Sequence, residues 1–287
     1  MDVKKKIAYI LTDSRLGGTE RFLLKILKRL VKTDQYEMNI FTLIGDGALN
    51  KLCSELKIKN EFLQFTKLNS LKNYFKLKKS VTKFQPDIIH SFLFHANYFS
   101  AHLKKGLITP KLIVSERCLD ISKNLFKIKL TRYYSGIADI VTAVSEDVQE
   151  LLIKREGIPR EKITLLKNGI EPSDYIFPEK STLRNEFKIP DNAFVIINIA
   201  RFRKEKGQVN LISAFKDVLK NKKDSYLILT GEGETEKELR NFTKKNNLES
   251  NVIFTGARND VINLLQGSDL AVNSSIEEGF SAFNLEA

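Results

Sequence analysis

The sequence has few cysteines and no long apolar run, and these absences exclude several classes of protein. Its two cysteines, Cys53 and Cys118, lie far apart and form no Cys-x-x-Cys motif, so a disulfide framework is not implied and a reducing cytoplasm suits the chain. No stretch reaches the roughly 18 consecutive apolar residues that a membrane-spanning helix needs. The apolar run near the N-terminus is short and lacks a small-residue cleavage site, so it predicts a first strand rather than a signal peptide.

Acidic residues are scarce in the first part of the chain. Residues 1–172 carry 31 Lys and Arg against 18 Asp and Glu, whereas residues 173–287 carry 16 against 17. Nucleic acid, anionic lipid or a phosphorylated acceptor would each suit this basic excess, and so would an ordinary solvated Lys-rich surface. No Asp-x-Asp pair occurs anywhere, so a metal-bridged diphosphate site of that kind is not supported and no metal site is predicted.

Short β-branched runs alternate with longer amphipathic ones, which is the rhythm of a parallel sheet covered by helices on both faces. Strands are expected at 6–12, 86–92, 111–116, 138–145 and 162–168, and a second series at 193–200, 225–230, 251–256 and 269–275. The turn-rich segment "NGIEPSDYIFPEK" separates the two series. We therefore predict an α/β protein with two Rossmann-like, doubly wound domains, residues 1–172 and 173–287.

Two loops that follow predicted strands carry candidate anion-binding residues. In "DSRLGGTE", Gly17 and Gly18 allow close backbone approach, and a helix start there would favour an anion; a plain glycine turn with Thr19 as N-cap fits equally well. In "ARFRKEKG", Arg201 and Lys206 stand where ligands bind in open α/β sheets and could grip a diphosphate. A solvated basic loop is the alternative for this second motif.

The last two motifs are less specific when taken alone. In "LTGEGE", Gly231 could let a base or ribose lie against the backbone, although a plain strand-to-helix turn is the simpler interpretation. In "EEGFSAFNLE", Glu278 precedes an expected helix and Glu286 follows about two turns inside it. The backbone N–H groups of Gly279, Phe280 and Ser281 would point outward at that helix start and could hold sugar hydroxyls or a phosphate. A surface helix with two ordinary acids is the alternative.

Taken together and in this order, the motifs resemble one family. The Gly-Gly loop, "PDIIH", "VSE…KNGIE", "ARFRKEKG", "TGEGE", "FTGARND" and the Glu-x7-Glu ending closely resemble the retaining glycosyltransferases of family 4, over nearly the whole chain. The resemblance implies the two-domain GT-B fold. It also implies transfer of a sugar from a nucleotide-diphosphate sugar, with UDP favoured as the nucleotide, to a glycan or lipid-linked acceptor in bacterial surface polysaccharide or glycolipid assembly.

The resemblance also assigns roles to the motif residues. Arg201 and Lys206 would neutralise the donor diphosphate, Gly17 and Gly18 would approach it from the first domain, and Glu286 would hold the ribose. The donor sugar would lie against a set of groups at the chain end: Glu278 and the backbone of Gly279, Phe280 and Ser281. Backbone around Gly231 and Arg258 would lie near the base. No cofactor or divalent metal is implied, because protein cations and helix N-termini neutralise the diphosphate.

A histidine near the predicted strand at 86–92 is the second catalytic candidate beside Glu278. Relatives often carry His-x-His here, with the second His beside the donor sugar. In this chain the segment reads "HSFLFH", so His90 matches the first position and Phe92 stands at the second. His95 lies three residues further on and could serve instead; a packed core histidine is the alternative. The front-face mechanism usually proposed for the family lets the departing phosphate take the acceptor proton, so no side-chain nucleophile is required.

Two basic segments in the first domain predict contact with an anionic membrane. Residues 62–85 hold six Lys and no acid, with a helical stripe formed by Leu68, Leu71, Tyr74, Phe75 and Val81, and residues 122–134 hold four cations mixed with apolar residues. Each segment could instead pack on the sheet with its lysines solvated. The resemblance places the acceptor in this domain, which predicts a cytoplasmic protein peripheral to the inner face of the cell membrane. A nucleic-acid-binding protein is the alternative, although the chain has no helix-turn-helix or aromatic RNA motif.

The chain end yields a separate expectation. Members of the family usually continue past the final "EA" with further helices and strands, and none of these follows Ala287. A second sheet with an uncovered flank would be prone to aggregation. On this basis the 287-residue chain is expected to be a C-terminally truncated enzyme with weak activity or none, or an inactive remnant.

Overall fold

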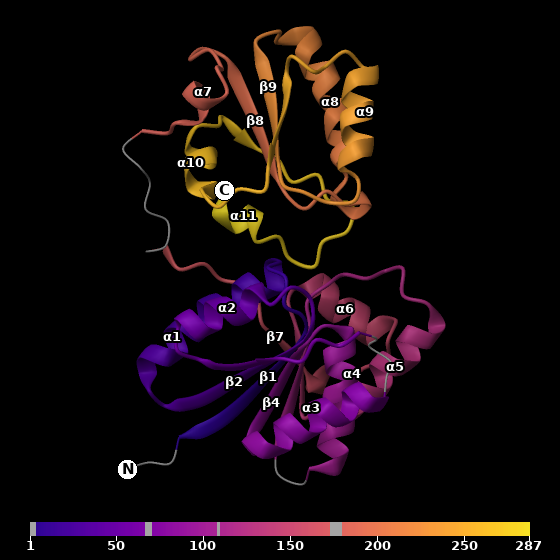
Figure 1. Cartoon of the computed structure of the whole chain (residues 1–287). Helices are drawn as coiled ribbons and strands as arrows, with labels where there is room; N and C mark the ends of the chain where they lie inside the picture. The colour runs from indigo at the N-terminus through magenta and orange to yellow at the C-terminus, as the bar shows by residue number, and fades with distance from the viewer. Residues whose placement is uncertain (1–3, 67–70, 108–109, 173–179) are drawn as a thin grey trace. The chain divides into compact units, whose positions relative to one another are not determined.

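The computed structural model describes residues 4–66, 71–107, 110–172 and 180–287 (Figure 1). It divides the chain into two compact units, Met1–Asn168 (unit 1) and Gly169–Ala287 (unit 2). The predicted boundary between residues 172 and 173 falls four residues beyond this division, and residues 173–179 lie outside the described part. The predicted α/β class, with a parallel sheet in each unit, is confirmed.

Unit 1 is built on a seven-stranded parallel sheet in the order β3-β2-β1-β4-β5-β6-β7. Its strands are β1 (Lys5–Asp13), β2 (Tyr36–Ile44), β3 (Lys59–Phe62), β4 (Ile88–Phe92), β5 (Lys111–Glu116), β6 (Ile140–Ala143) and β7 (Ile163–Leu165). Its helices are α1 (Gly18–Thr33), α2 (Ala48–Glu55), α3 (Leu71–Phe84), α4 (Phe94–Gly106), α5 (Leu125–Ile137) and α6 (Glu146–Lys154). Figure 1 shows α1 and α2 on one side of this sheet and α4 and α5 on the other.

Strands β2 and β3 are absent from the sequence-based prediction. β2 is nine residues long and its central residues are buried, because it lies inside the sheet between β1 and β3. β3 is a four-residue edge strand, "KNEF", with no fully buried position. A short polar edge strand has neither alternation nor an apolar run, so its sequence resembles a loop.

Unit 2 is built on a four-stranded parallel sheet in the order β10-β9-β8-β11. Its strands are β8 (Phe194–Ile199), β9 (Ser225–Thr230), β10 (Val252–Gly256) and β11 (Leu270–Ala271). Its helices are α7 (Leu183–Glu186), α8 (Gln208–Asn221), α9 (Glu236–Lys245), α10 (Val261–Gln266) and α11 (Phe283–Glu286), with a 3-10 turn at Lys204–Lys206. Two apolar clusters cover the two faces of this sheet, one with α8 and α9 and the other with α7 and α10. Figure 1 shows these two pairs of helices on opposite sides of the sheet.

Two glycines fix the loops at the carboxyl edge of the unit 2 sheet. A Cβ atom added at Gly231, where φ is +144°, would lie 2.0 Å from the carbonyl oxygen of Ala200, and one at Gly233 would lie 2.2 Å from that of Phe202. The loop after β9 therefore packs directly on the backbone of the loop after β8. These glycines are needed by the fold itself, in agreement with the simpler interpretation of the "LTGEGE" motif.

Replacing Gly231 by alanine should destabilise unit 2 by roughly 2–3 kcal/mol, because the added methyl group clashes with backbone and φ is unfavourable for any other residue. The Gly169→Ala variant is the control, since a Cβ there meets no atom within 4 Å. Urea unfolding of both variants measures the effect. Equal midpoints for the two would show that the loop can move away from Ala200 at little cost.

Candidate active site

The loop that carries Arg201 and Lys206 packs against the segment before α11. Gly207, at φ +64°, ends the 3-10 turn and begins α8, and a Cβ there would lie 2.2 Å from the carbonyl oxygen of Ser274. Ser274 Oγ donates to the carbonyl of Lys206 at 2.8 Å, and the Ile276 N–H donates to that of Glu205 at 2.8 Å. Residues 274–278 are therefore held beside the basic loop.

This packing brings together Lys206 and Glu278, two of the predicted site residues. Lys206 Nζ lies 2.5 Å from Glu278 Oε2, and Ser275 Oγ donates to the same oxygen at 3.0 Å. The side chains are 22% and 29% exposed, so the ion pair is partly shielded but open to solvent. A cation suited to a phosphate and a carboxylate suited to sugar hydroxyls thus share one place at the carboxyl edge of the sheet.

Arg201 lies two residues beyond the end of β8, on the exposed side of the same loop. Its carbonyl oxygen accepts a hydrogen bond from Gln208 Nε2 at 3.0 Å, which ties the strand end to the first turn of α8. The predicted pair of cations therefore comes from one loop, which is anchored by α8 and by the side chain of Ser274. Such anchoring keeps charged groups in place without a metal ion.

The helix at the chain end begins later than predicted. α11 starts at Phe283, with Ala282 as its N-cap, rather than at residues 279–281, and Ser281 Oγ accepts from the Asn284 N–H at 3.3 Å. Gly279, Phe280 and Ser281 consequently form the loop before the helix. Glu286 is the last residue of α11, one turn inside it instead of two.

Gly231 and Arg258 are both engaged by the fold. The Gly231 N–H donates to the Gly256 carbonyl at 2.9 Å, and the position of a Cβ at Gly231 is filled by the Ala200 backbone. The Arg258 guanidinium forms ion pairs with Glu186 and with Asp260, and it holds the pKa of Asp260 well below its usual range. Only the backbone at these two positions remains suited to the predicted contact with a base.

In unit 1, Gly17 is the N-cap of α1 and Gly18 its first residue. Thr19, the alternative cap, lies inside the helix. The Gly17 N–H donates to Glu20 Oε2 at 3.0 Å, so the helix start already holds one carboxylate of its own. A Cβ at Gly18 would meet no atom within 4 Å, so packing does not require glycine there. The open space at Gly18 is consistent with approach by a ligand.

Of the two histidines considered, His90 lies within β4 and packs on an aromatic side chain, whereas His95 lies after this strand in the first turn of α4. His90 stacks on Phe92 with ring centroids 4.3 Å apart, its Nε2 lies 2.8 Å from Ser115 Oγ, and burial lowers its pKa to about 3. His95 is the second residue of α4, half-buried beside Phe94, and burial with the charge of Lys127 lowers its pKa. His95 is therefore favoured as a neutral hydrogen-bonding group.

The burial of His90 predicts a pH dependence of stability. The unfolded chain takes up a proton on this residue near pH 6.5, whereas the folded chain does so only near pH 3. The free energy of unfolding should therefore fall as the pH is lowered from about 6.5, by up to roughly 1.4 kcal/mol per pH unit from this residue. Urea unfolding at several pH values should show a flatter slope for His90→Asn, and an unchanged slope would mean that His90 is protonated in the folded protein.

Sequence reasoning overlooked Arg117, which follows β5 directly. Its Cζ lies 4.0 Å from the centre of the Phe22 ring on α1, and its Nη2 donates to Asn168 Oδ1. The only sequence signal was its position one residue after a strand end, where ligands bind in sheets of this kind.

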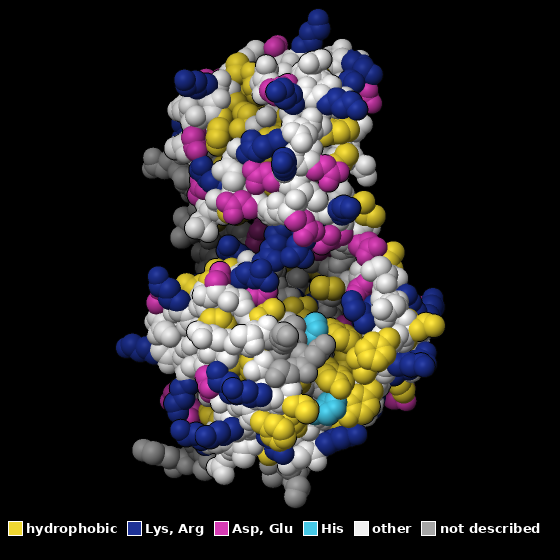
Figure 2. Space-filling model, turned by 45° about the vertical axis from the view of Figure 1, so that its right-hand side comes forward, with side chains coloured by type: hydrophobic (Ala, Val, Ile, Leu, Met, Phe, Trp, Pro, Cys, Tyr) yellow, Lys and Arg dark blue, Asp and Glu magenta, His cyan; other side chains and the backbone are white. Residues whose placement is uncertain are grey.

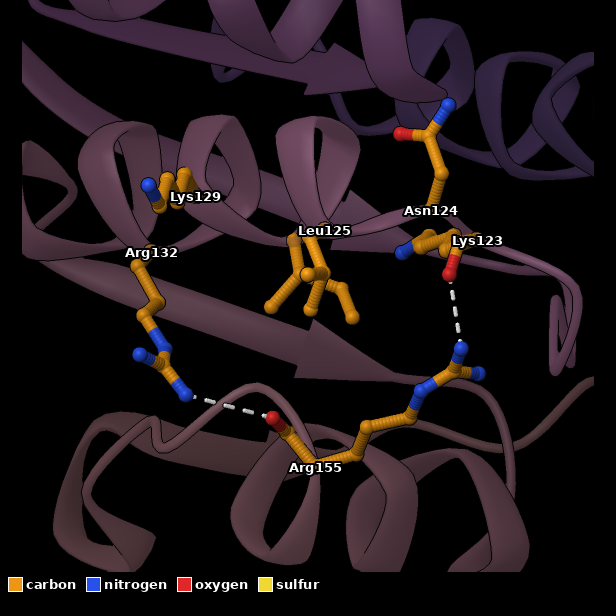
Figure 3. Close-up of a pocket in the computed structure, with 7 residues that line it drawn as sticks. Lys123, Asn124, Leu125, Lys129, Arg132 and Arg155 are labelled. Atoms are coloured by element: carbon orange, nitrogen blue, oxygen red, sulfur yellow. Dashed lines mark hydrogen bonds between the residues drawn. The ribbon is translucent and has the colours of Figure 1, made fainter.

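A basic pocket of about 530 Å³ lies beside the start of α5 (Figure 3). Arg132 Nη2 donates to the Arg155 carbonyl at 3.3 Å, and Arg155 Nη2 donates to the Lys123 carbonyl at 2.6 Å. Lys123 Nζ itself lies 2.8 Å from a carboxylate oxygen of Glu156. Most of the cations around this pocket therefore form contacts that stabilise the loop before α5. These contacts explain why basic residues gather here without any need for a ligand.

Exposed apolar side chains accompany the predicted basic segments. In α3, Leu77, Val81 and Phe84 are buried, whereas Leu71 and Phe75 are exposed, so the predicted stripe is divided; Leu68 lies outside the described residues. Near the start of α5, Ile121, Leu125 and Phe126 are 52%, 78% and 68% exposed. Figure 2 shows hydrophobic side chains gathered on one face of unit 1, with lysines and arginines around them.

The described residues show neither a cluster of metal-binding side chains nor a membrane-spanning helix. No group of three or more His, Cys, Asp or Glu side chains in residues 4–66, 71–107, 110–172 and 180–287 is placed to hold a metal ion. Over the same ranges, no helix is long and apolar enough to cross a membrane.

Family models match both units of the chain. The model "Glycosyltransferase Family 4" matches residues 16–174, and the model "Glycosyl transferases group 1" matches residues 179–287. The first covers more than half of the chain.

The chain is also similar to individual proteins, although the sequence identities are low. The N-acetyl-alpha-D-glucosaminyl L-malate synthase of Bacillus anthracis is 28% identical over 70% of this chain, which spans 54% of that protein's length. The UDP-Gal:alpha-D-GlcNAc-diphosphoundecaprenol alpha-1,3-galactosyltransferase of Escherichia coli is 22% identical over 99% of the chain and 77% of its own length. The crystal structure of Anabaena HepE in complex with UDP-glucose matches with a TM-score of 0.82 at 23% identity, over 94% of this chain and 74% of that one.

Proposed function

The chain belongs to glycosyltransferase family 4 and has the GT-B fold, and from this premise we propose that it transfers a sugar, with retention of configuration, from a UDP-sugar to a glycan or lipid-linked acceptor. The observation that carries the proposal is the meeting of Lys206 and Glu278 at the carboxyl edge of the unit 2 sheet. The Lys206 side chain suits the diphosphate, which is the leaving group, and the Glu278 side chain suits the hydroxyls of the sugar that is transferred. We place the reaction in bacterial surface polysaccharide or glycolipid assembly, the setting of several relatives.

In the proposed mechanism the chain's cations act on the leaving group. Arg201 and Lys206 neutralise the charge that grows on the diphosphate as the bond to the sugar breaks, which lowers the barrier most when these groups are already held in place. Glu278 accepts hydrogen bonds from hydroxyls of the donor sugar, and Glu286 accepts them from the ribose. The departing phosphate takes the proton of the acceptor hydroxyl, which attacks from the same face. His95 contributes a neutral hydrogen bond at the edge of the sheet in unit 1.

Titration of the full chain with UDP-, GDP- and ADP-sugars by calorimetry tests the donor site. We expect a UDP-sugar to bind at micromolar to submillimolar concentration without added metal, and EDTA to leave its affinity unchanged. The proposal is contradicted if no sugar nucleotide binds. Loss of binding with EDTA would instead contradict only the assignment of the diphosphate to protein cations.

The acceptor side of the proposal includes the membrane. Leu125 and Phe126 are exposed beside the cations Lys127 and Lys129 at the start of α5, a combination that favours the surface of an anionic bilayer. A relative acts on a diphosphoundecaprenol-linked sugar, according to its name. Peripheral binding at the cytoplasmic face would bring such an acceptor to unit 1. Sedimentation with anionic vesicles should fall several-fold for the Leu125→Ser/Phe126→Ser variant, and equal sedimentation would contradict this contact.

A further inference from the structure

The turn between β4 and α4 lies at the point where the order of strands in unit 1 reverses. β1 pairs with β2 on one side and with β4 on the other, and the register places Leu11 of β1 opposite Phe92, the last residue of β4. The carboxyl ends of two strands at such a point border the crevice in which open α/β sheets bind ligands. A single residue, Leu93, separates β4 from α4, and His95 is the second residue of that helix.

Leu93 has an unusual backbone conformation. Its φ of 72° and ψ of 158° lie outside the left-handed helical region, in a range that is almost confined to glycine. In the described ranges, the other non-glycine residues with positive φ have values between 53° and 58°; they are Asp34, Lys57, Gln64, Gln85, Lys188 and Asn247. All of these except Gln64 follow a helix end by one or two residues, where left-handed residues are common. Leu93 instead precedes a helix, so the end of a helix does not explain its conformation.

Two hydrogen bonds fix the backbone around His95. The Asn97 N–H donates to the Leu93 carbonyl at 2.9 Å, and the Ala96 N–H donates to Thr12 Oγ1 of β1 at 3.1 Å. The Leu93 side chain packs on the apolar cluster that α1 and α2 form with the sheet. An unfavourable turn persists only where the surrounding contacts impose it, and these contacts do so from both sides of His95.

The Asn97 side chain adds a buried polar network to these contacts. Asn97 is fully buried, and its Oδ1 accepts from Ser91 Oγ of β4 at 2.8 Å. Its Nδ2 donates to the Ser115 carbonyl at 3.2 Å and to Glu116 Oε1 at 3.0 Å, at the end of β5. Tyr134 of α5 donates to the same Glu116 oxygen at 2.6 Å. The network therefore ties the first turn of α4 to two strand ends, and it uses both the oxygen and the nitrogen of the Asn97 amide.

We propose that Asn97 and Thr12 are positioning residues, which hold the strained turn at Leu93 and thereby place His95 beside a hydroxyl of the donor sugar. The proposal rests on the proposed function, which gives His95 its hydrogen bond in the reaction. A group that is fixed before the substrate arrives needs no reordering when the transition state forms. Asn97 is a positioning residue and touches no substrate, because it is buried and its polar atoms are bonded inside unit 1.

Titration of the histidines by NMR tests this arrangement without any turnover. The chain has three histidines, so a His→Gln variant of each assigns its signal. Burial and the charge of Lys127, on α5, lower the pKa of His95. Asn97→Ala should release the first turn of α4, so the pKa of His95 should rise toward the ordinary value of 6.5. Ser100→Ala is the matched control on the same helix, because Ser100 is buried and its Oγ has no hydrogen-bond partner among the described residues. It should leave the pKa of His95 unchanged.

Thr12→Val is a milder variant in case Asn97→Ala does not fold. It keeps the shape of the side chain and removes the acceptor of the Ala96 N–H, so it should also raise the pKa of His95, whereas Thr12→Ser should restore it. In both Asn97→Ala and Thr12→Val, hydrolysis of a UDP-sugar should fall tenfold or more, mainly in kcat. The affinity for UDP, which lacks the sugar, should change less than twofold.

Two results would overturn the proposal. One is an unchanged pKa of His95 in each folded variant of Asn97 and Thr12. The other is a rate of hydrolysis in His95→Gln within twofold of that of the unchanged chain, because the turn would then have no reacting group to position. Failure of UDP-sugars to bind the unchanged chain would instead count against the proposed function, and binding with an unchanged pKa would count against this inference alone.

Discussion

Replacing Lys206 by alanine should lower the affinity for UDP by about 10- to 100-fold and the slow hydrolysis of a UDP-sugar by about 10²- to 10³-fold. A charge-assisted hydrogen bond to phosphate contributes roughly 1.5–3 kcal/mol, and its contribution grows as charge develops on the leaving group. Lys206 is held for this role, since Gly207 and Ser274 fix the backbone on both sides of the contact. Calorimetry and measurement of UDP release give the two effects without knowledge of the acceptor.

Lys204→Ala is the matched control for this variant. Lys204 belongs to the same 3-10 turn, carries the same charge and is exposed, so its loss changes the net charge of the loop equally. It should change UDP affinity less than about twofold, as expected for a screened surface charge. If the two variants lose affinity alike, the loop acts only through its total charge, and the placement of the diphosphate on Lys206 is wrong.

Replacing Glu278 by glutamine should have two opposite effects. In the structure Glu278 holds Lys206 at 2.5 Å, so a diphosphate must compete with this carboxylate for the lysine. Removing the negative charge should raise the affinity for UDP by about three- to tenfold, a modest gain because the ion pair is partly exposed. At the same time the variant should lose sugar recognition, so that hydrolysis of the UDP-sugar falls by about 10²-fold.

Comparing the affinity for UDP with the affinity for the UDP-sugar shows whether Glu278 is responsible for both effects. For the unchanged chain the sugar should add affinity, and for Glu278→Gln this addition should disappear. Glu277→Gln is the control, because the side chain of that neighbouring acid forms no hydrogen bond or ion pair with any residue that the structure describes. A fall in UDP affinity for Glu278→Gln would mean that the ion pair positions Lys206 for the diphosphate rather than competing with it.

Several parts of the candidate site could be predicted from local sequence. Arg201 and Lys206 follow a buried strand and precede a helix, so their place at the sheet edge follows from the rule that ligands bind at the carboxyl ends of parallel strands. Gly18 was singled out correctly as the start of a helix region, although Glu20, rather than Thr19, completes the cap. The start of α11 was predicted too early, since this helix begins at Phe283 with Ala282 as its N-cap.

The residues that were overlooked depend on contacts between distant segments. No sequence motif surrounds Arg117. Its contacts are made with Phe22 and Asn168, which lie far from it in the sequence. One interpretation of the sequence placed a base or ribose against the backbone of Gly231. In the structure, the space beside Gly231 is filled by the backbone of Ala200 in the preceding loop. Neither fact can be read from a window of neighbouring residues.

The sequence by itself determined the class of the fold, most of the alternation of strands and helices apart from β2 and β3, the presence of two units and the family. Each of these depends on residue periodicity or on motifs that lie within a few residues of one another. Only the tertiary structure decided that Lys206 and Glu278 form an ion pair, that the environment of His90 lowers its pKa, and that Arg117 stacks on Phe22 of α1. The physical reason is that strand order and loop packing set which side chains meet, and with them the burial and the charge that each group experiences.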